Sequence, residues 1–324
     1  MINVRIYYVG IVVILLLGSC QNNADQEKQK NDQKPKLTEE EKRAKQNIEQ
    51  SGKQPYNIRQ LNKKIQQNKN KPELYYQRAL AYRKAGKLKY SMNDLYEALK
   101  RDSTKAKYYL SLSDLFLEQQ NITRAINTIQ KALEENPDNP ELLVRLGRYH
   151  YYLKEHDKAI TNVDKALQQN MYLADGYMVK GLIFKEIGDT SKAISNLQTA
   201  VEQDPNMHDA YMQLGLLHST KNDDLALDYF DNALEVDSNS VDAFYGKAMF
   251  HQERSNYAKA KKFYKDIIEI EPQYGKAFYN IGLTAESQGD HEKAKRNYRQ
   301  ALGIKPDYEL AQKGMKRINE GKEM

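Results

Sequence analysis

Residues 174–207 read ADGYMVKGLIFKEIGDTSKAISNLQTAVEQDPNM, and the next stretch, 208–240, reads HDAYMQLGLLHSTKNDDLALDYFDNALEVDSNS. Each stretch holds two runs in which apolar side chains recur at the spacing of one face of an α-helix. A short polar segment separates the two runs, and Gly181 and Gly215 occupy the same place in the first run. The pattern predicts a pair of helices that is repeated along the chain.

The repeat has a period of 34 residues, with one residue missing near Asn222 in the turn between two helices. It gives seven units: 72–105, 106–139, 140–173, 174–207, 208–240, 241–274 and 275–308. Position 8 of every unit is small: Ala79, Ser113, Gly147, Gly181, Gly215, Ala248 and Gly282. With the missing residue counted, position 20 is also small: Ser91, Ala125, Ala159, Ala193, Ala226, Ala260 and Ala294. We expect the two helices of a unit to cross at these positions, because larger side chains would force them apart.

These small residues, together with prolines that end the second helix at position 32, resemble the pattern of the tetratricopeptide repeat family. The prolines are Pro137, Pro205, Pro272 and Pro306. The resemblance covers residues 72–308. It implies an all-α fold, namely a right-handed α-solenoid (superhelix) of seven tetratricopeptide repeats that binds other proteins and performs no chemistry.

Two further segments are expected to cap the array, because the end units of a solenoid have no neighbour to cover their apolar faces. Residues 57–71 form the predicted N-terminal capping helix, with apolar side chains at helical spacing. Residues 309–324 form the predicted C-terminal capping helix. Its apolar stripe consists of Leu310, Ala311, Met315 and Ile318.

The N-terminus has the composition of a signal peptide, with an apolar run at 11–17 that is too short to span a bilayer comfortably. The sequence Leu-Gly-Ser-Cys at 17–20 resembles the lipobox of bacterial lipoproteins and predicts lipid attachment at Cys20, the single cysteine. We therefore expect residues 1–19 to be a signal peptide that is removed. The alternative is an ordinary signal peptide with a chance cysteine.

Residues 20–56 contain the lipidated cysteine and a stretch rich in Gln, Asn, Lys and Glu, which predicts a flexible tether because it has little apolar surface to bury. Gln21 follows the lipidated residue. By the family pattern this favours an outer membrane lipoprotein, with the periplasmic or surface face left open. The tether and the tyrosine-rich array also resemble lipoproteins of the Bacteroidota.

Charge and motifs argue against several classes of function. The 50 basic and 44 acidic residues are spread along the chain, without the concentrated basic face that nucleic-acid binding needs. No phosphate-binding loop, zinc-protease motif or nucleophile elbow occurs. His150, His218 and His251 recur at position 11, too far apart in successive units to share a metal ion. We therefore expect them to be repeat-core residues, and we predict no enzyme, cofactor or metal site.

The resemblance implies that the first helix of each unit lines a concave groove. From the fourth unit onward, positions 5 and 9 hold Met, Leu or Tyr, which suit protein recognition. The alternative is that the next unit covers this stripe, which would make it core between repeats. Arg145 and Arg148 give the first units a basic section that fits an acidic segment. The candidate groove residues are Arg145, Arg148, Met178, Leu182, Met212, Gln213, Leu216, Tyr245, Met249, Lys276, Tyr279, Asn280 and Leu283.

These features predict a membrane-anchored adaptor or scaffold of the bacterial cell envelope. By resemblance, its partner would be a cell-wall enzyme or a component of a secretion or outer-membrane assembly complex. The alternative is a glycan- or nutrient-binding outer-membrane lipoprotein, since some glycan-capturing proteins contain related helices. That class needs aromatic platforms and inserted loops, whereas this chain has no Trp and its units are uninterrupted.

Overall fold

The computed structural model of the protein describes residues 57–321. Within this range every regular element is an α-helix, and the predicted all-α solenoid is confirmed. A helix at 57–67 comes first. The bounds of the labelled helices are α2 Pro72–Lys84, α3 Leu88–Arg101, α4 Ala106–Glu118, α5 Ile122–Glu135, α6 Pro140–Tyr152, α7 His156–Gln169, α8 Ala174–Glu186, α9 Thr190–Gln203, α10 His208–Thr220, α11 Leu225–Val236, α12 Val241–Glu253, α13 Tyr257–Ile270, α14 Gly275–Ser287, α15 His291–Ile304 and α16 Glu309–Asn319.

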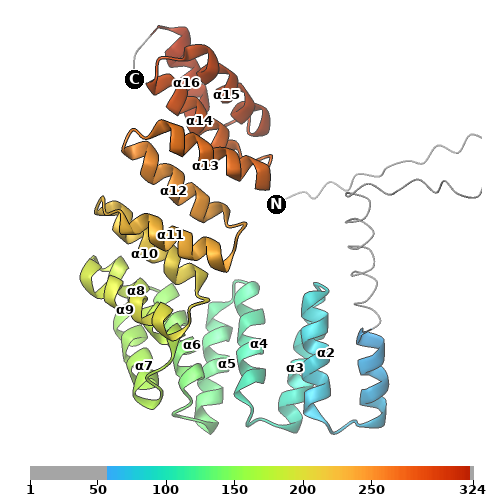
Figure 1. Cartoon of the computed structure of the whole chain (residues 1–324). Coiled ribbons are helices and arrows are strands. Elements are labelled where there is room, and N and C mark those ends of the chain that lie inside the picture. The colour runs from blue at the N-terminus through green and yellow to red at the C-terminus, as the bar shows by residue number, and fades with distance from the viewer. Residues whose placement is uncertain (1–56, 322–324) are drawn as a thin grey trace, which may run out of the picture. The chain divides into compact units, whose positions relative to one another are not determined.

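The helices form successive hairpins that lie side by side from α2 to α16 (Figure 1). Each even-numbered helix packs against the odd-numbered helix that follows it. Even-numbered helices also contact one another across units, as in the pairs α4–α6, α6–α8, α10–α12 and α14–α16. The first helices therefore form a continuous layer, and residues at equal positions of neighbouring units come close together.

Small residues allow the two helices of each unit to cross closely. A Cβ atom added to Gly181 on α8 would lie 2.6 Å from Cγ of Leu197 on α9. Ala193, the position 20 residue of the same unit, is fully buried. Because atoms at such a distance would overlap, a side chain at this point would force Leu197 and α9 to move away from α8.

The turn between the two helices has one recurring backbone conformation. Position 15 has a positive φ in every unit: Gly86, Gln120, Lys154, Gly188, Asn222, Ser255 and Gly289. A left-handed residue just after a helix lets the chain reverse direction while its N–H groups bond to the last carbonyls. The next helix is often capped by a side chain, as where Asp189 accepts a hydrogen bond of 3.1 Å from the Lys192 backbone N–H.

The fifth unit has a shorter second helix than its neighbours. Helix α11 has 12 residues, whereas α9 and α13 have 14. The missing residue of this unit lies between Asn222 and Ala226, where the chain leaves the turn and enters α11. The fully buried Ala226 keeps its place in the crossing, so the deletion leaves the packing of α10 and α11 intact.

Both ends of the array are covered. In the helix at 57–67, Leu61 and Ile65 are buried against Leu74 and Tyr75 of the first unit. Helix α16 buries Ala311 and Ile318 against the last unit. The expectation that Leu310 joins this apolar stripe is wrong. Its side chain is 49% exposed, because α16 turns its next residue, Ala311, towards α15.

A buried ion pair ties helix α16 to the last unit. Arg317 donates two hydrogen bonds, of 2.7 and 2.8 Å, to the carboxylate of Glu286 on α14, and the hydroxyl of Tyr298 also donates to it. Burial raises the pKa of the Glu286 carboxyl, but these hydrogen bonds outweigh burial and hold that pKa below its usual range. The carboxylate is therefore charged and fully paired, as a buried charge must be.

Candidate functional site

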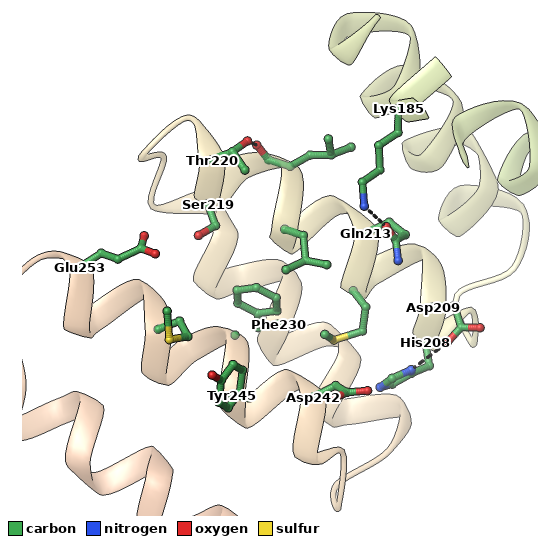
Figure 2. A pocket seen from close by; sticks show the side chains of 15 residues that line it. Lys185, His208, Asp209, Gln213, Ser219, Thr220, Phe230, Asp242, Tyr245 and Glu253 are labelled. Carbon is green, nitrogen blue, oxygen red and sulfur yellow. Dashed lines mark hydrogen bonds and ion pairs between the residues drawn. The ribbon is translucent and has the colours of Figure 1, made fainter. Parts of the chain in front are cut away.

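A cavity of about 630 Å³ opens between the first helices of the fifth and sixth units, and we call it the α10–α12 cavity (Figure 2). Helix α8 contributes Lys185 to its lining and α11 contributes Phe230. Five of the candidate groove residues line it: Met212, Gln213, Leu216, Tyr245 and Met249. The cavity therefore lies on the layer of first helices where the sequence placed the groove.

The floor of the cavity is the ring of Phe230, which is fully buried between two glycines. A Cβ atom added to Gly215 on α10 would lie 2.6 Å from Cε1 of the ring. A Cβ atom added to Gly246 on α12 would lie 2.5 Å from Cζ. Both first helices thus reach the same aromatic ring because neither has a side chain there.

Leu216 lines the cavity and is 40% exposed. The same fraction is exposed at Leu80, which holds the same position, 9, in the first unit. Exposure at this position is therefore not particular to the fifth unit, and the cavity is distinguished by the buried ring of Phe230 beneath it.

Carboxylates stand at both ends of the cavity (Figure 2). Asp209 and Asp242 are the second residues of α10 and α12, and Glu253 is the last residue of α12. Asp209 lies 3.3 Å from Nδ1 of His208. Asp242 and Glu253 are exposed, and neither forms a hydrogen bond or an ion pair with any residue in 57–321.

One lysine completes the lining at the side of α8. Nζ of Lys185 donates a hydrogen bond of 2.5 Å to Oε1 of Gln213, which links the fourth and fifth units. His208 contacts Oγ of Ser240 through Nε2 at 2.8 Å. The cavity therefore combines an apolar floor with a polar rim on which carboxylates outnumber ammonium groups.

The two candidate arginines line a separate hollow of about 300 Å³. Arg145 is hydrogen-bonded to Asp114, and Nη2 of Arg148 lies 2.6 Å from Oδ1 of Asp175. These aspartates come from the first helices of the preceding and following units, respectively. The arginines thus have carboxylate partners within the array, which weakens the expected attraction for an acidic segment.

The other candidate residues line neither of these two hollows. Met178 is 7% exposed and belongs to the core beside Leu182, which is half-buried. Asn280 is buried and donates a hydrogen bond of 3.1 Å to the hydroxyl of Tyr245. The half-buried Tyr279 stacks on Tyr298. The remaining two are the exposed Lys276 and the half-buried Leu283.

The three recurring histidines occupy one packing position. All are buried, and His150 and His218 pair through Nδ1 with Glu155 and Asp223, at 2.5 and 2.7 Å. His251 instead stacks on Phe263, and burial, followed by nearby lysines, lowers its pKa. Within residues 57–321 no cluster of histidine, cysteine and acidic side chains is suited to a metal ion.

Sequence reasoning did not place Phe230 or Gly246 in the site. The signal for Gly246 was present, because position 6 carries a side chain in the other six units: Gln77, Ser111, Arg145, Val179, Gln213 and Asn280. Phe230 had no such signal, since it belongs to a second helix, whereas the groove was expected on the first helices. No helix in the described range has the length and apolar character needed to cross a bilayer.

Comparison with known proteins gives one family. Models of the tetratricopeptide repeat match residues 110–174, 178–241, 241–274 and 275–308. No curated protein matches the chain.

Three solved structures illustrate the similarity. YrrB, described as a TPR protein with an unusual peptide-binding site, has 25% identity and a TM-score of 0.50 over 58% of this chain and 97% of its own. A tetratricopeptide repeat protein from Parabacteroides merdae has 16% identity and a TM-score of 0.52 over 76% of this chain and 97% of its own. The APC/C hetero-tetramer Cut9–Hcn1 has 19% identity and a TM-score of 0.59, over 80% of this chain and 51% of the matched one.

Proposed function

Because this chain belongs to the tetratricopeptide repeat family, we propose that it is a protein-interaction scaffold whose helices α10 and α12 hold a segment of a partner protein. From its N-terminal sequence we propose that it acts in the bacterial cell envelope. The fold itself supports a role in protein–protein interaction. The similarity to YrrB, whose description includes a peptide-binding site, supports the finer proposal that the partner is held through a short segment.

The observation that carries this proposal is the α10–α12 cavity. Leu216, Met249 and Tyr245 remain partly exposed and line a hollow over a floor formed by Phe230. Apolar and aromatic side chains in a hollow with a polar rim are typical of the residues that dominate binding at protein interfaces. A side chain of the partner that enters the cavity would displace water from these groups.

We expect Leu216→Lys to weaken partner binding by about tenfold or more, because it places a charge where an apolar contact is made. The measurement is photo-crosslinking in cells from an unnatural amino acid at Gln213, followed by mass spectrometry and titration of the identified partner. The melting temperature should change little, since Leu216 is 40% exposed.

The matched control is Leu310→Lys, the same substitution at a leucine that is 49% exposed on α16. It should leave both partner binding and the melting temperature unchanged. Equal partner binding by the Leu216→Lys variant and the unaltered chain would show that the cavity is not the binding site.

We also propose that the chain is an outer membrane lipoprotein, with residues 1–19 as signal peptide, Cys20 as lipid attachment site and residues 20–56 as tether. The proposal is supported by the sequence alone, and these residues lie outside the described range. Cell-wall enzymes and components of secretion or outer-membrane assembly complexes are the partner classes we propose for a protein held there.

Cys20→Ser is expected to abolish incorporation of labelled palmitate and to move the protein from the membrane fraction to the soluble fraction. The physical reason is that several acyl chains hold a protein on a bilayer stably, at about 0.8 kcal/mol per buried methylene, whereas the tether has little apolar surface. Membrane retention and labelling that persist in this variant would contradict the anchor.

A further inference from the structure

The rim of the α10–α12 cavity differs in charge from the chain as a whole. The chain has a formal net charge of +6. The cavity, in contrast, is lined by the carboxylates of Asp209, Asp242 and Glu253 and by a single ammonium group, that of Lys185. This locally negative surface on a basic protein favours a positively charged ligand, because complementary charges select partners at interfaces.

The carboxylates at the two ends of α12 are available to a ligand. Asp242 and Glu253 are exposed and have no ion pair or hydrogen bond with residues 57–321. Lys185 does not neutralise them, since its ammonium group is directed to Gln213 on α10 (Figure 2). Helix α14, the first helix of the seventh unit, has one lysine, Lys276, and this residue does not line the cavity.

The distance between these carboxylates limits the shape of the ligand. Asp242 is the second and Glu253 the last residue of α12, so their Cα atoms are separated by about 16 Å at 1.5 Å per helical residue. Side chains of an extended peptide alternate between its two faces, so residues four positions apart point the same way and lie about 13 Å apart at about 3.3 Å per residue, within reach of the two carboxylates for long basic side chains. Tyr245 and Met249 lie between the two carboxylates, beside the Phe230 floor.

We propose that the α10–α12 cavity binds an extended basic segment of a partner protein. This segment has two lysine or arginine residues four positions apart, which pair with Asp242 and Glu253, and an apolar side chain midway between them that enters the cavity over Phe230. The inference rests on the proposed function, because it names the chemistry of the segment held by α10 and α12. The apolar contact supplies most of the affinity, and the exposed ion pairs supply mainly selectivity.

The test uses the full-length chain and two fluorescent synthetic peptides that differ only in charge, Lys-Ser-Leu-Ser-Lys and Glu-Ser-Leu-Ser-Glu. Fluorescence anisotropy measures their affinities at low and high salt. We expect the basic peptide to bind at least about tenfold more tightly than the acidic one. We also expect this preference to shrink at high salt, since exposed charges are screened within about 10 Å at 0.1 M.

Two double variants locate the effect. Asp242→Asn with Glu253→Gln should reduce the preference for the basic peptide to about twofold or less, because it removes both charges and keeps the shape of the side chains. Asp228→Asn with Glu235→Gln is the matched control. It removes two exposed carboxylates of α11 that do not line the cavity, so it should leave the preference unchanged.

Equal affinities for the two peptides would overturn the inference, as would a basic peptide that fails to bind at concentrations up to about 1 mM. A preference that survives in the Asp242→Asn, Glu253→Gln variant would also overturn it. The proposed function is judged separately. If Leu216→Lys abolishes partner crosslinking but the two neutralised carboxylates do not affect it, the binding site stands and its occupant is not a basic segment.

Discussion

Leucine in place of Gly181 is expected to lower the free energy of unfolding by about 3 kcal/mol, at the upper end of the cost of overpacking a core. Even a Cβ atom there would lie 2.6 Å from Cγ of Leu197 and 3.4 Å from the backbone oxygen of Ala193. Both neighbours are fully buried, so they have no free space to move into. Urea unfolding followed by far-UV circular dichroism would measure the effect as a lower midpoint.

Gly303→Ala is the matched control for this substitution. Gly303 also lies inside a helix, α15, but a Cβ atom added to it meets no atom within 4 Å. This variant should gain up to about 1 kcal/mol, because alanine favours the helix more than glycine does. If the Gly181→Leu variant unfolded at the same urea concentration as the unaltered chain, the close crossing of α8 and α9 would not determine the fold.

Phe230→Ala is expected to cost about 3–5 kcal/mol, which is the usual range for removing a buried phenylalanine side chain. Its ring is fully buried and fills the space beside the backbones of Gly215 and Gly246. Because two first helices and α11 meet at this ring, the cavity left behind cannot be filled by a single rotamer change. Calorimetric melting temperature and urea midpoint should both fall.

Tyr172→Ala controls for the loss of an aromatic ring as such. Tyr172 is 69% exposed in the turn between α7 and α8, and its removal should change stability by less than about 0.5 kcal/mol. Comparable losses in the Phe230→Ala and Tyr172→Ala variants would mean that the ring of Phe230 does not join the fifth and sixth units.

Much of the fold was predictable because the repeat imposes the same packing problem seven times. A small residue at position 8 of each unit, such as Gly181, marks the point where the two helices cross closely, and a single sequence shows it seven times. The exposed Leu310 was predicted incorrectly because the capping helix occurs once. With no second copy to compare, its helical spacing did not fix which apolar side chain faces the last unit.

The candidate site was predictable only in its general location. The sequence indicated the first helices and left open whether the candidate side chains line a groove or belong to the core. In the structure some of them are core and others line the cavity. Met178 is core, whereas Leu216 lines the cavity. The difference depends on what the next unit places over each residue. Met178 holds position 5 and Leu216 position 9, and periodicity shows that both lie on a first helix but not how deeply neighbouring helices cover each of them.

The Phe230 ring lies under two first helices at once, so a ligand above it touches both the fifth and the sixth unit. Such a ligand would hold the two units in one relative orientation, because any change in the tilt of one unit against the other would break contacts with the ligand. Binding would therefore stabilise the middle of the array against bending and local opening, because a ligand that binds the folded state stabilises that state. Occupancy of one small hollow would thereby make the middle of the array stiffer than it is without a ligand.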